Sequence, residues 1–192
     1  GGGTVEISGE TTNISSENNN VIGNTTTGKI DIKGGTIETT SGRAIQNNGI
    51  VNISDGVING CTTGTNPVIW NTNGTLNITG GTVSGIGSTA IYVASGNANI
   101  SGDASITSQN YYGLFNANSG KIDISGGTIR SDNSFGIGNN GTGTLNITNG
   151  RISTVKNIAI DNSSSTEVSI SGGIIESEIA TVIKNNSTGT IN

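Results

Sequence analysis

Three aromatic residues recur at nearly equal intervals and are the clearest candidates for ligand chemistry in this chain. Trp70, Tyr92 and Phe115 each follow an aliphatic residue directly, and Tyr112 lies just before the last of them. If each aliphatic side chain points inward from a strand, the next residue points outward, so the three rings would form one exposed column. Such a patch often marks a binding site, and flat rings beside hydroxyl and amide groups can hold a sugar chain. The alternatives are an aromatic ladder that only stabilises the outer face of a sheet, or a contact with a flanking domain.

A second candidate is a weak calcium site, because calcium is bound by carboxylate oxygens. Glu6 and Asp31 lie at equivalent positions of neighbouring repeats, and Asp103 and Asp132 fall in expected loops. The competing interpretation is scattered charge that keeps the chain soluble. The sequence contains no His and a single Cys, so a metal site with nitrogen or sulfur ligands is not expected.

The composition narrows the function classes further. Eight basic and 13 acidic residues give a net charge of −5. No basic cluster is present to neutralise phosphates, so nucleic acid is not an expected partner. No apolar run has the length of a membrane span, so we expect no membrane insertion. The lone Cys61 has no partner for an internal disulfide and is interpreted as a small residue in a turn.

The elements that must position these residues come from an internal repeat. The phrase Lys121-Ile-Asp-Ile-Ser-Gly-Gly-Thr-Ile129 returns in related form about every 23 residues. Alternation in its first part places aliphatic residues on one face and Asp or Asn on the other, as in a short strand. A corner rich in glycine follows, where positive φ costs little. The inward aliphatic residues of a second segment come next, at Ile37, Ile58, Val83, Ile106, Ile129, Ile152 and Ile175.

A third segment carries the most specific signal of the repeat. Its aliphatic residues are Ile22, Ile45, Ile69, Ile91, Leu114, Ile137, Ile160 and Ile183. Two positions after them stand Asn24, Asn47, Asn71, Asn116, Asn139, Asn162 and Asn185, with Val93 as the one exception. A polar column of this kind is tolerable in an interior only if each amide bonds to its neighbours. We therefore expect an asparagine ladder at a turn, with a local change of turn geometry at Val93.

The pattern predicts an all-β fold, a single-stranded parallel β-helix of about eight coils of roughly 23 residues with three short strands per coil. One domain covers 1–192, with an irregular N-terminal coil over 1–28, regular coils over 29–189 and the start of a further coil at 190–192. The chain lacks an initiator Met, and we expect it to be a segment of a longer chain or one subunit of a fibre.

The coil pattern and the asparagine column, over essentially all of residues 3–192, resemble the right-handed parallel β-helix of the pectin-lyase-like superfamily. In style the short Gly-, Thr- and Asn-rich coils are closest to repetitive bacterial surface proteins and adhesins. The resemblance implies a right-handed helix, in line with the handedness of parallel crossovers. The catalytic residues of pectate lyases and polygalacturonases cannot be carried over, because no position here matches their pattern.

We therefore expect a non-enzymatic structural or interaction protein, a β-helical stalk, adhesin or self-assembling fibre segment without catalytic residues. The expected location is extracellular or on a cell surface, with a bacterial source. The expected partner is the chain itself, by head-to-tail stacking of coils, or flanking coils of a longer chain. The alternative is a carbohydrate-binding module that uses Trp70, Tyr92, Phe115 and Tyr112. A polysaccharide lyase or hydrolase is the third hypothesis, and no cofactor is expected other than calcium.

Overall fold

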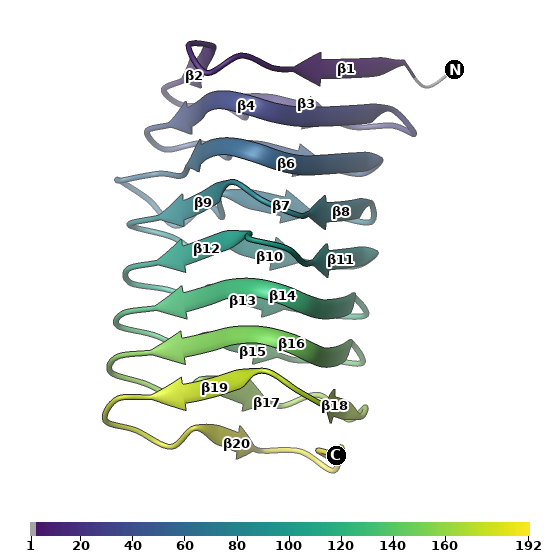
Figure 1. Cartoon of the computed structure of the whole chain (residues 1–192), viewed down its shortest axis with the longest axis vertical. Coiled ribbons are helices and arrows are strands. Elements are labelled where there is room, and N and C mark those ends of the chain that lie inside the picture. The colour runs from purple at the N-terminus through teal and green to yellow at the C-terminus, as the bar shows by residue number, and fades with distance from the viewer. Residues whose placement is uncertain (1–2) are drawn as a thin grey trace.

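A computed structural model describes residues 3–192, so the Gly1 and Gly2 start of the expected N-terminal coil lies outside the described residues. The described chain is all-β and winds through stacked coils of about 23 residues, about eight in number, that form a parallel β-solenoid. In Figure 1 the front strands run from right to left and the chain returns behind them. Each coil lies below the previous one, which makes the winding right-handed.

The first and second segments of the coils belong to one 12-stranded sheet. In four coils they are separate strands: β1 (Thr4–Ile7) and β2 (Asn13–Ser16), β8 (Thr75–Ile78) and β9 (Thr82–Gly85), β11 (Asn97–Ile100) and β12 (Ser105–Ser108), β18 (Val168–Ile170) and β19 (Ile174–Ser177). In the other four coils they run on as single strands: β4 (Lys29–Thr39), β6 (Ile50–Asn59), β14 (Lys121–Ser131) and β16 (Thr144–Thr154). The sequence predicts three strands in every coil, and these four differ because the glycine corner bends the strand without ending it.

The corners are bulges whose two residues have different tasks. Between β14 and β16 the register shifts on either side of Ser125. The second residue of the corner needs a left-handed backbone, with φ of 77° at Gly127 and 104° at Gly150. The first residue varies in type, but at Gly172 space is limiting, since a Cβ there would lie 2.3 Å from the Thr148 carbonyl oxygen of the coil before. Both the expected positive φ and the close approach therefore favour glycine here.

The third segments form a separate 8-stranded parallel sheet on the other side of the core. Its strands are β3 (Ile22–Asn24), β5 (Ile45–Asn47), β7 (Ile69–Asn71), β10 (Ile91–Val93), β13 (Leu114–Asn116), β15 (Ile137–Asn139), β17 (Ile160–Asn162) and β20 (Ile183–Asn185). The central residue of each strand points outward. This sheet therefore carries the expected aromatic column on its outer face and the aliphatic and Asn columns inside.

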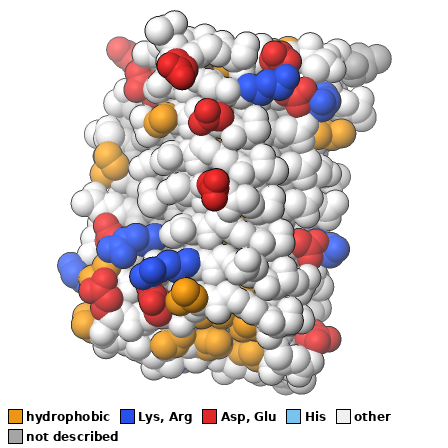
Figure 2. Space-filling model, in the orientation of Figure 1, with side chains coloured by type: hydrophobic (Ala, Val, Ile, Leu, Met, Phe, Trp, Pro, Cys, Tyr) orange, Lys and Arg blue, Asp and Glu red, His pale blue; other side chains and the backbone are white. Residues whose placement is uncertain are grey.

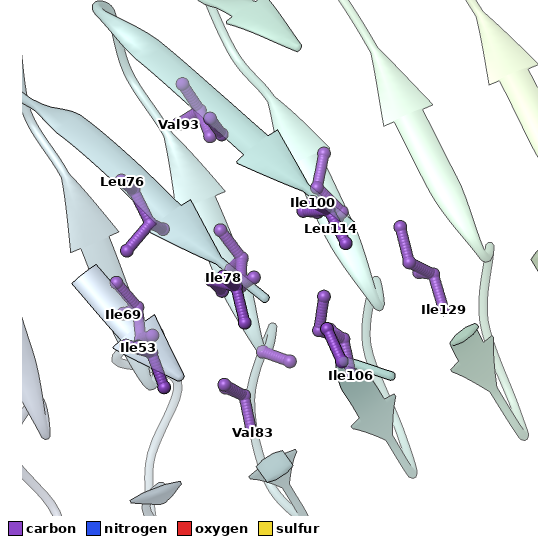
Figure 3. Close-up of a cluster of buried hydrophobic side chains, with 14 of the residues drawn as sticks. Ile53, Ile69, Leu76, Ile78, Val83, Val93, Ile100, Ile106, Leu114 and Ile129 are labelled. Carbon is purple, nitrogen blue, oxygen red and sulfur yellow. The ribbon is translucent and has the colours of Figure 1, made fainter. Parts of the chain in front are cut away.

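The core is a set of aliphatic columns that run along the solenoid axis. Figure 3 shows members of the three segments meeting in the interior, among them Ile78, Val83 and Leu114. All three are fully buried. Since successive coils lie about 4.8 Å apart, each of these side chains packs against its equivalents above and below.

The columns become exposed at the two ends of the solenoid. Val5 in the first coil is 56% exposed, and Ile175 and Ile183 in the last coil are only partly buried. Figure 2 shows a mostly polar face over the 12-stranded sheet, with hydrophobic side chains gathered towards the end that holds the C-terminus. Among residues 3–192, the end coils have a packed neighbour on one side only.

Candidate functional site

The expected aromatic column is present and in register. Trp70 of β7 pairs with Tyr92 of β10, and Tyr92 pairs with Phe115 of β13. All three side chains are half-buried on the outer face of the third-segment sheet. Alternation along the strand positions them, because the residues on both sides of each ring point into the core.

The rings beyond Trp70 pack against one another. The ring centroids of Tyr92 and Phe115 are 5.4 Å apart, and those of Tyr112 and Phe115 are 4.6 Å apart. Tyr112 also stacks on Phe135, with centroids 5.2 Å apart and planes 18° apart. We call Tyr92, Tyr112, Phe115 and Phe135 the aromatic cluster. Phe135 was not predicted, and its only sequence signal is its position two residues before Ile137, which matches that of Tyr112 before Leu114.

A glycine makes room for the aromatic cluster. Gly138 occupies the outward position next to Phe115 in the sheet. A Cβ at Gly138 would lie 2.5 Å from Cε1 of Tyr112 and 2.7 Å from Cδ2 of Phe115. The column therefore stops at Phe115 because both rings lean over the backbone of β15.

Trp70 has a different neighbour, Arg43 of the preceding coil. The guanidinium carbon of Arg43 lies 4.0 Å from the centre of the Trp70 ring, a cation–π contact. Trp70 Nε1 and Arg43 Nε are both buried without a hydrogen-bond partner among residues 3–192. Burial lowers the pKa of Arg43 below its ordinary value. Sequence reasoning did not single out Arg43, which is one coil earlier and two residues before Ile45.

One ionisable group of the cluster is perturbed. Burial raises the pKa of Tyr112 above its usual 10.0, and the negative charge of Asp161 raises it further. Asp161 lies on β17, two strands away from Phe115 across Gly138. The neutral phenol is therefore the favoured form of Tyr112 over a wider pH range than in an isolated tyrosine.

The calcium candidates Glu6 and Asp31 are in register but already bonded to lysines. Glu6 pairs with Asp31 between β1 and β4. Lys33 Nζ lies 2.7 Å from Glu6 Oε2, and Lys29 Nζ lies 2.8 Å from Asp31 Oδ2. The hydrogen bond from Asn52 and the bond from Lys29 lower the pKa of Asp31. The pair thus forms an alternating row of charges on the surface.

The loop acids Asp103 and Asp132 do not join the pair. Asp132 Oδ1 accepts a hydrogen bond from Arg130 Nε at 2.8 Å, and Asp103 is exposed in a turn. Over residues 3–192, no group of three or more His, Cys, Asp or Glu side chains is placed to hold a metal ion.

The asparagine ladder lies inside the turn that follows the third-segment sheet. Asn24 Nδ2 donates to Asn47 Oδ1 at 3.0 Å, and Asn47 Nδ2 donates to Asn71 Oδ1 at 2.8 Å. The series is interrupted at Val93 and resumes on its C-terminal side, from Asn116 through Asn139 and Asn162 to Asn185. Each of these three bonds is 2.9 Å long. Amides from Asn24 to Asn162 are buried, so the ladder satisfies polar groups that water cannot reach.

The turn changes at the break, as Val93 predicts. Gly96 of that turn has φ of 77°, whereas Gly74 at the equivalent position of the previous coil does not have a left-handed backbone. The Oδ1 atom of Asn116 is buried and has no hydrogen-bond donor among the described residues 3–192. The exception in the sequence is therefore also an exception in hydrogen bonding.

A second ladder, of hydroxyl groups, was not predicted. Ser131 Oγ donates to the Tyr111 carbonyl at 2.7 Å and accepts from the amide of Ser134. Ser108 and Ser177 make the same pair of bonds with the loops beside them. The sequence signal is a Ser or Thr two residues after the second-segment aliphatic residue. These hydroxyls fix the start of the variable loop to the coil before it.

Two shallow hollows lie along the outer side of the second segments. Their volumes are about 470 and 380 Å³, and both are bordered by Ser84 and Ile86. Most residues that line the larger hollow are Ser or Thr, and Glu17, Glu38 and Asn59 line it too. The arrangement offers hydrogen bonds to a polar ligand. The part of the chain that the structure describes has no helix that could cross a membrane.

No protein-family model, curated protein or solved structure matches this chain.

Proposed function

We propose that this chain is a non-enzymatic structural protein, a β-solenoid stalk or fibre segment on the outside of a bacterial cell. The observation that supports it most strongly is the continuity of its ladders. The aliphatic columns recur in every coil, and the amide column recurs in every coil but that of Val93; both lie in the interior. In such an array each coil is stabilised chiefly by its two neighbours. A rod of this kind can therefore be lengthened by adding coils.

The partner that fits this role is another stack of coils. Coils of a second copy, or flanking coils of a longer chain, would cover the exposed Val5 at one end and the partly buried Ile175 at the other. Kinship with the pectin-lyase-like superfamily, and with repetitive surface adhesins within it, is part of the proposal. Its support is the right-handed parallel winding and the asparagine ladder.

Carbohydrate binding is the second candidate, and the in-register column of Trp70, Tyr92 and Phe115 favours it. Three half-exposed rings on successive coils span roughly 10 Å, enough for a short glycan to contact more than one ring. Against it, Arg43 covers one face of Trp70 and the aromatic cluster packs ring on ring. Ring contacts of this kind stabilise the outer sheet without any ligand.

A glycan array separates the two candidates. The structural role predicts no binding by wild type beyond that of a variant with Trp70, Tyr92 and Phe115 all changed to alanine. If wild type binds a glycan and the triple variant does not, the result would favour carbohydrate binding. Turnover of pectins and related polymers, with calcium present, would instead support the enzyme hypothesis.

Negative-stain microscopy tests the structural role directly, through the shape of the particles. Filaments of one coil width, or short rods of uniform size, are the expected particles. Irregular globular particles would contradict the role.

A further inference from the structure

The asparagine ladder has a direction, which makes the two ends of the solenoid chemically different. In each bond of this ladder, the Nδ2 atom of one coil donates to the Oδ1 atom of the next coil towards the C-terminus. The first member therefore keeps an open acceptor, and the last member keeps an open donor.

The open acceptor is Oδ1 of Asn24. This side chain is 5% exposed, and within residues 3–192 it donates to the Asn47 side chain and to backbone carbonyls without accepting a bond itself. The open donor is on Asn185. An interior member such as Asn139 donates both to the carbonyl of its own turn, at Gly143, and to the next amide. Asn185 makes only the first of these bonds, to Gly189 at 2.7 Å, so one of its two N–H groups is free.

The apolar columns and the strand edges at the N-terminal face also match those at the C-terminal face. Ile14 and Ile22 lead two columns at the N-terminal face, and Ile175 and Ile183 end the same two columns at the C-terminal face. All four side chains are only partly buried. β3 and β20 are the outermost strands of the third-segment sheet, on opposite sides. The free edge of β3 in one copy can therefore continue the parallel pairing at the free edge of β20 in another.

We propose that a second copy of this chain stacks head to tail on the first. Ile14 and Ile22 of one copy lie on Ile175 and Ile183 of the other, and Asn185 donates to Asn24 across the junction. The proposal rests on the structural function above, and it names the partner. Because the contact joins two different faces, it does not close, and it continues into a filament.

One segment competes with the incoming copy. Ile191 pairs with Val168, and Asn192 exchanges backbone bonds of 2.7 and 3.0 Å with Ile170 and Val168. Residues 190–192 thereby occupy the edge of β18 that Thr4–Ile7 of a second copy needs. In the described part of the chain, no segment pairs with the outer edges of β19 and β20. The last three residues must leave β18 before the copies can stack fully.

The test uses two single-site variants that each block one face. Ile183→Lys places a charge in a C-terminal-face column, and Ile22→Lys does the same at the N-terminal face. Sedimentation velocity of wild type should show species that grow with concentration. Each variant alone should remain monomeric over that range, because association weakens about tenfold for each 1.4 kcal/mol lost. Lys184→Ser, on the outward side of β20, is the matched control and should associate like wild type.

Mixing the two blocked variants gives the decisive result. Each retains one open face of the opposite kind, so an equimolar mixture should form a one-to-one dimer that does not grow. A chain that ends at Gly189 should associate at lower concentration than wild type, since the competing segment is gone.

The proposal would be overturned if wild type and the shortened chain both stay monomeric. It would also be overturned if either blocked variant dimerises on its own. Circular dichroism of each monomer keeps this result separate from the structural function, which requires only that the solenoid be folded. An unfolded blocked variant would be replaced by Ile175→Lys or Ile14→Lys in the same mixing experiment.

Discussion

Val93 lies in register with Asn116, and its methyl groups stand where every other coil of the ladder has an amide. The side-chain carbonyl of Asn116 is left buried without a donor. Asn71 on the other side donates only to backbone carbonyls, at Gly74, Ser95 and Asn97. The break therefore weakens hydrogen bonding at the middle of the solenoid.

Restoring the amide should stabilise the chain. Val93→Asn supplies a donor for Asn116 and an acceptor for Asn71, and we expect the free energy of unfolding to rise by about 1 kcal/mol. For a chain of this size that corresponds to roughly 2–4 °C in Tm, which calorimetry measures. Val93→Ala, which removes volume and adds no amide, should lower Tm. An Asn variant as unstable as the Ala variant would show that the turn after Val93 cannot accept a ladder residue.

Removing an interior amide should be costly. Asn139 is fully buried, accepts a bond from Asn116 and donates to Asn162. Asn139→Ala removes one buried hydrogen bond from each neighbour, and we expect a loss of about 2–3 kcal/mol in denaturant unfolding. The neighbouring Asn140→Ala, whose side chain is not in the ladder, should change stability by less than about 0.5 kcal/mol. Equal effects of the two substitutions would contradict the ladder as a source of stability.

Gly138 should be the position most sensitive to an added methyl group on the outer sheet. Gly138→Ala forces the Tyr112 and Phe115 rings aside, because its Cβ would lie 2.5 and 2.7 Å from them. We expect a changed near-ultraviolet circular dichroism spectrum and a loss of about 1 kcal/mol. Gly23→Ala is the control in the same outward column, where the nearest atom to a Cβ is 3.8 Å away. An unchanged aromatic spectrum in Gly138→Ala would mean that the rings are not packed as a cluster.

The raised pKa of Tyr112 predicts a loss of stability in alkali. The unfolded chain releases the phenol proton near pH 10.0 and the folded chain releases it only above that value. The contribution of Tyr112 is thus complete below pH 10.0 and is lost as pH rises through the folded pKa. Asp161→Asn should lower the folded pKa in part, because burial remains the larger cause. The pKa of Tyr112 is measured by spectrophotometric titration of wild type, with Tyr112→Phe as the reference. A pKa that Asp161→Asn does not change would exclude the charge as a cause.

The repeat made the coils predictable, because a strict phase of Ile and Asn is a direct consequence of stacking. Ile37 and Asn47 recur at equivalent positions in nearly every coil, so their burial follows from the pattern alone. The contact of Arg43 with Trp70 could not be predicted in this way. The position two residues before the third segment holds Asn20, Arg43, Pro67 and Tyr112 in different coils, so it has no repeating type to read.

The same limit applies to bonds that depend on loop length. The hydroxyl of Ser131 reaches the Tyr111 carbonyl only because of how the loop of the preceding coil folds back. The pairing of Glu6 with Asp31 across neighbouring strands follows from the repeat. Their contacts with lysines depend on side-chain rotamers, which the repeat does not determine. Columns along the axis were therefore predictable, and contacts between variable positions required the structure.

Native-state hydrogen exchange tests the central claim most directly, that this is a structural solenoid in which each coil is stabilised by both neighbours. Amides of the middle strands β6, β8, β14 and β16 should exchange last and with similar free energies of opening, close to that of global unfolding. Amides of β1 and β20, with one neighbouring coil each, should exchange first. Opening of β7, β10 or β13 before the end strands would contradict the account, because it would place a mobile site in the middle of the solenoid.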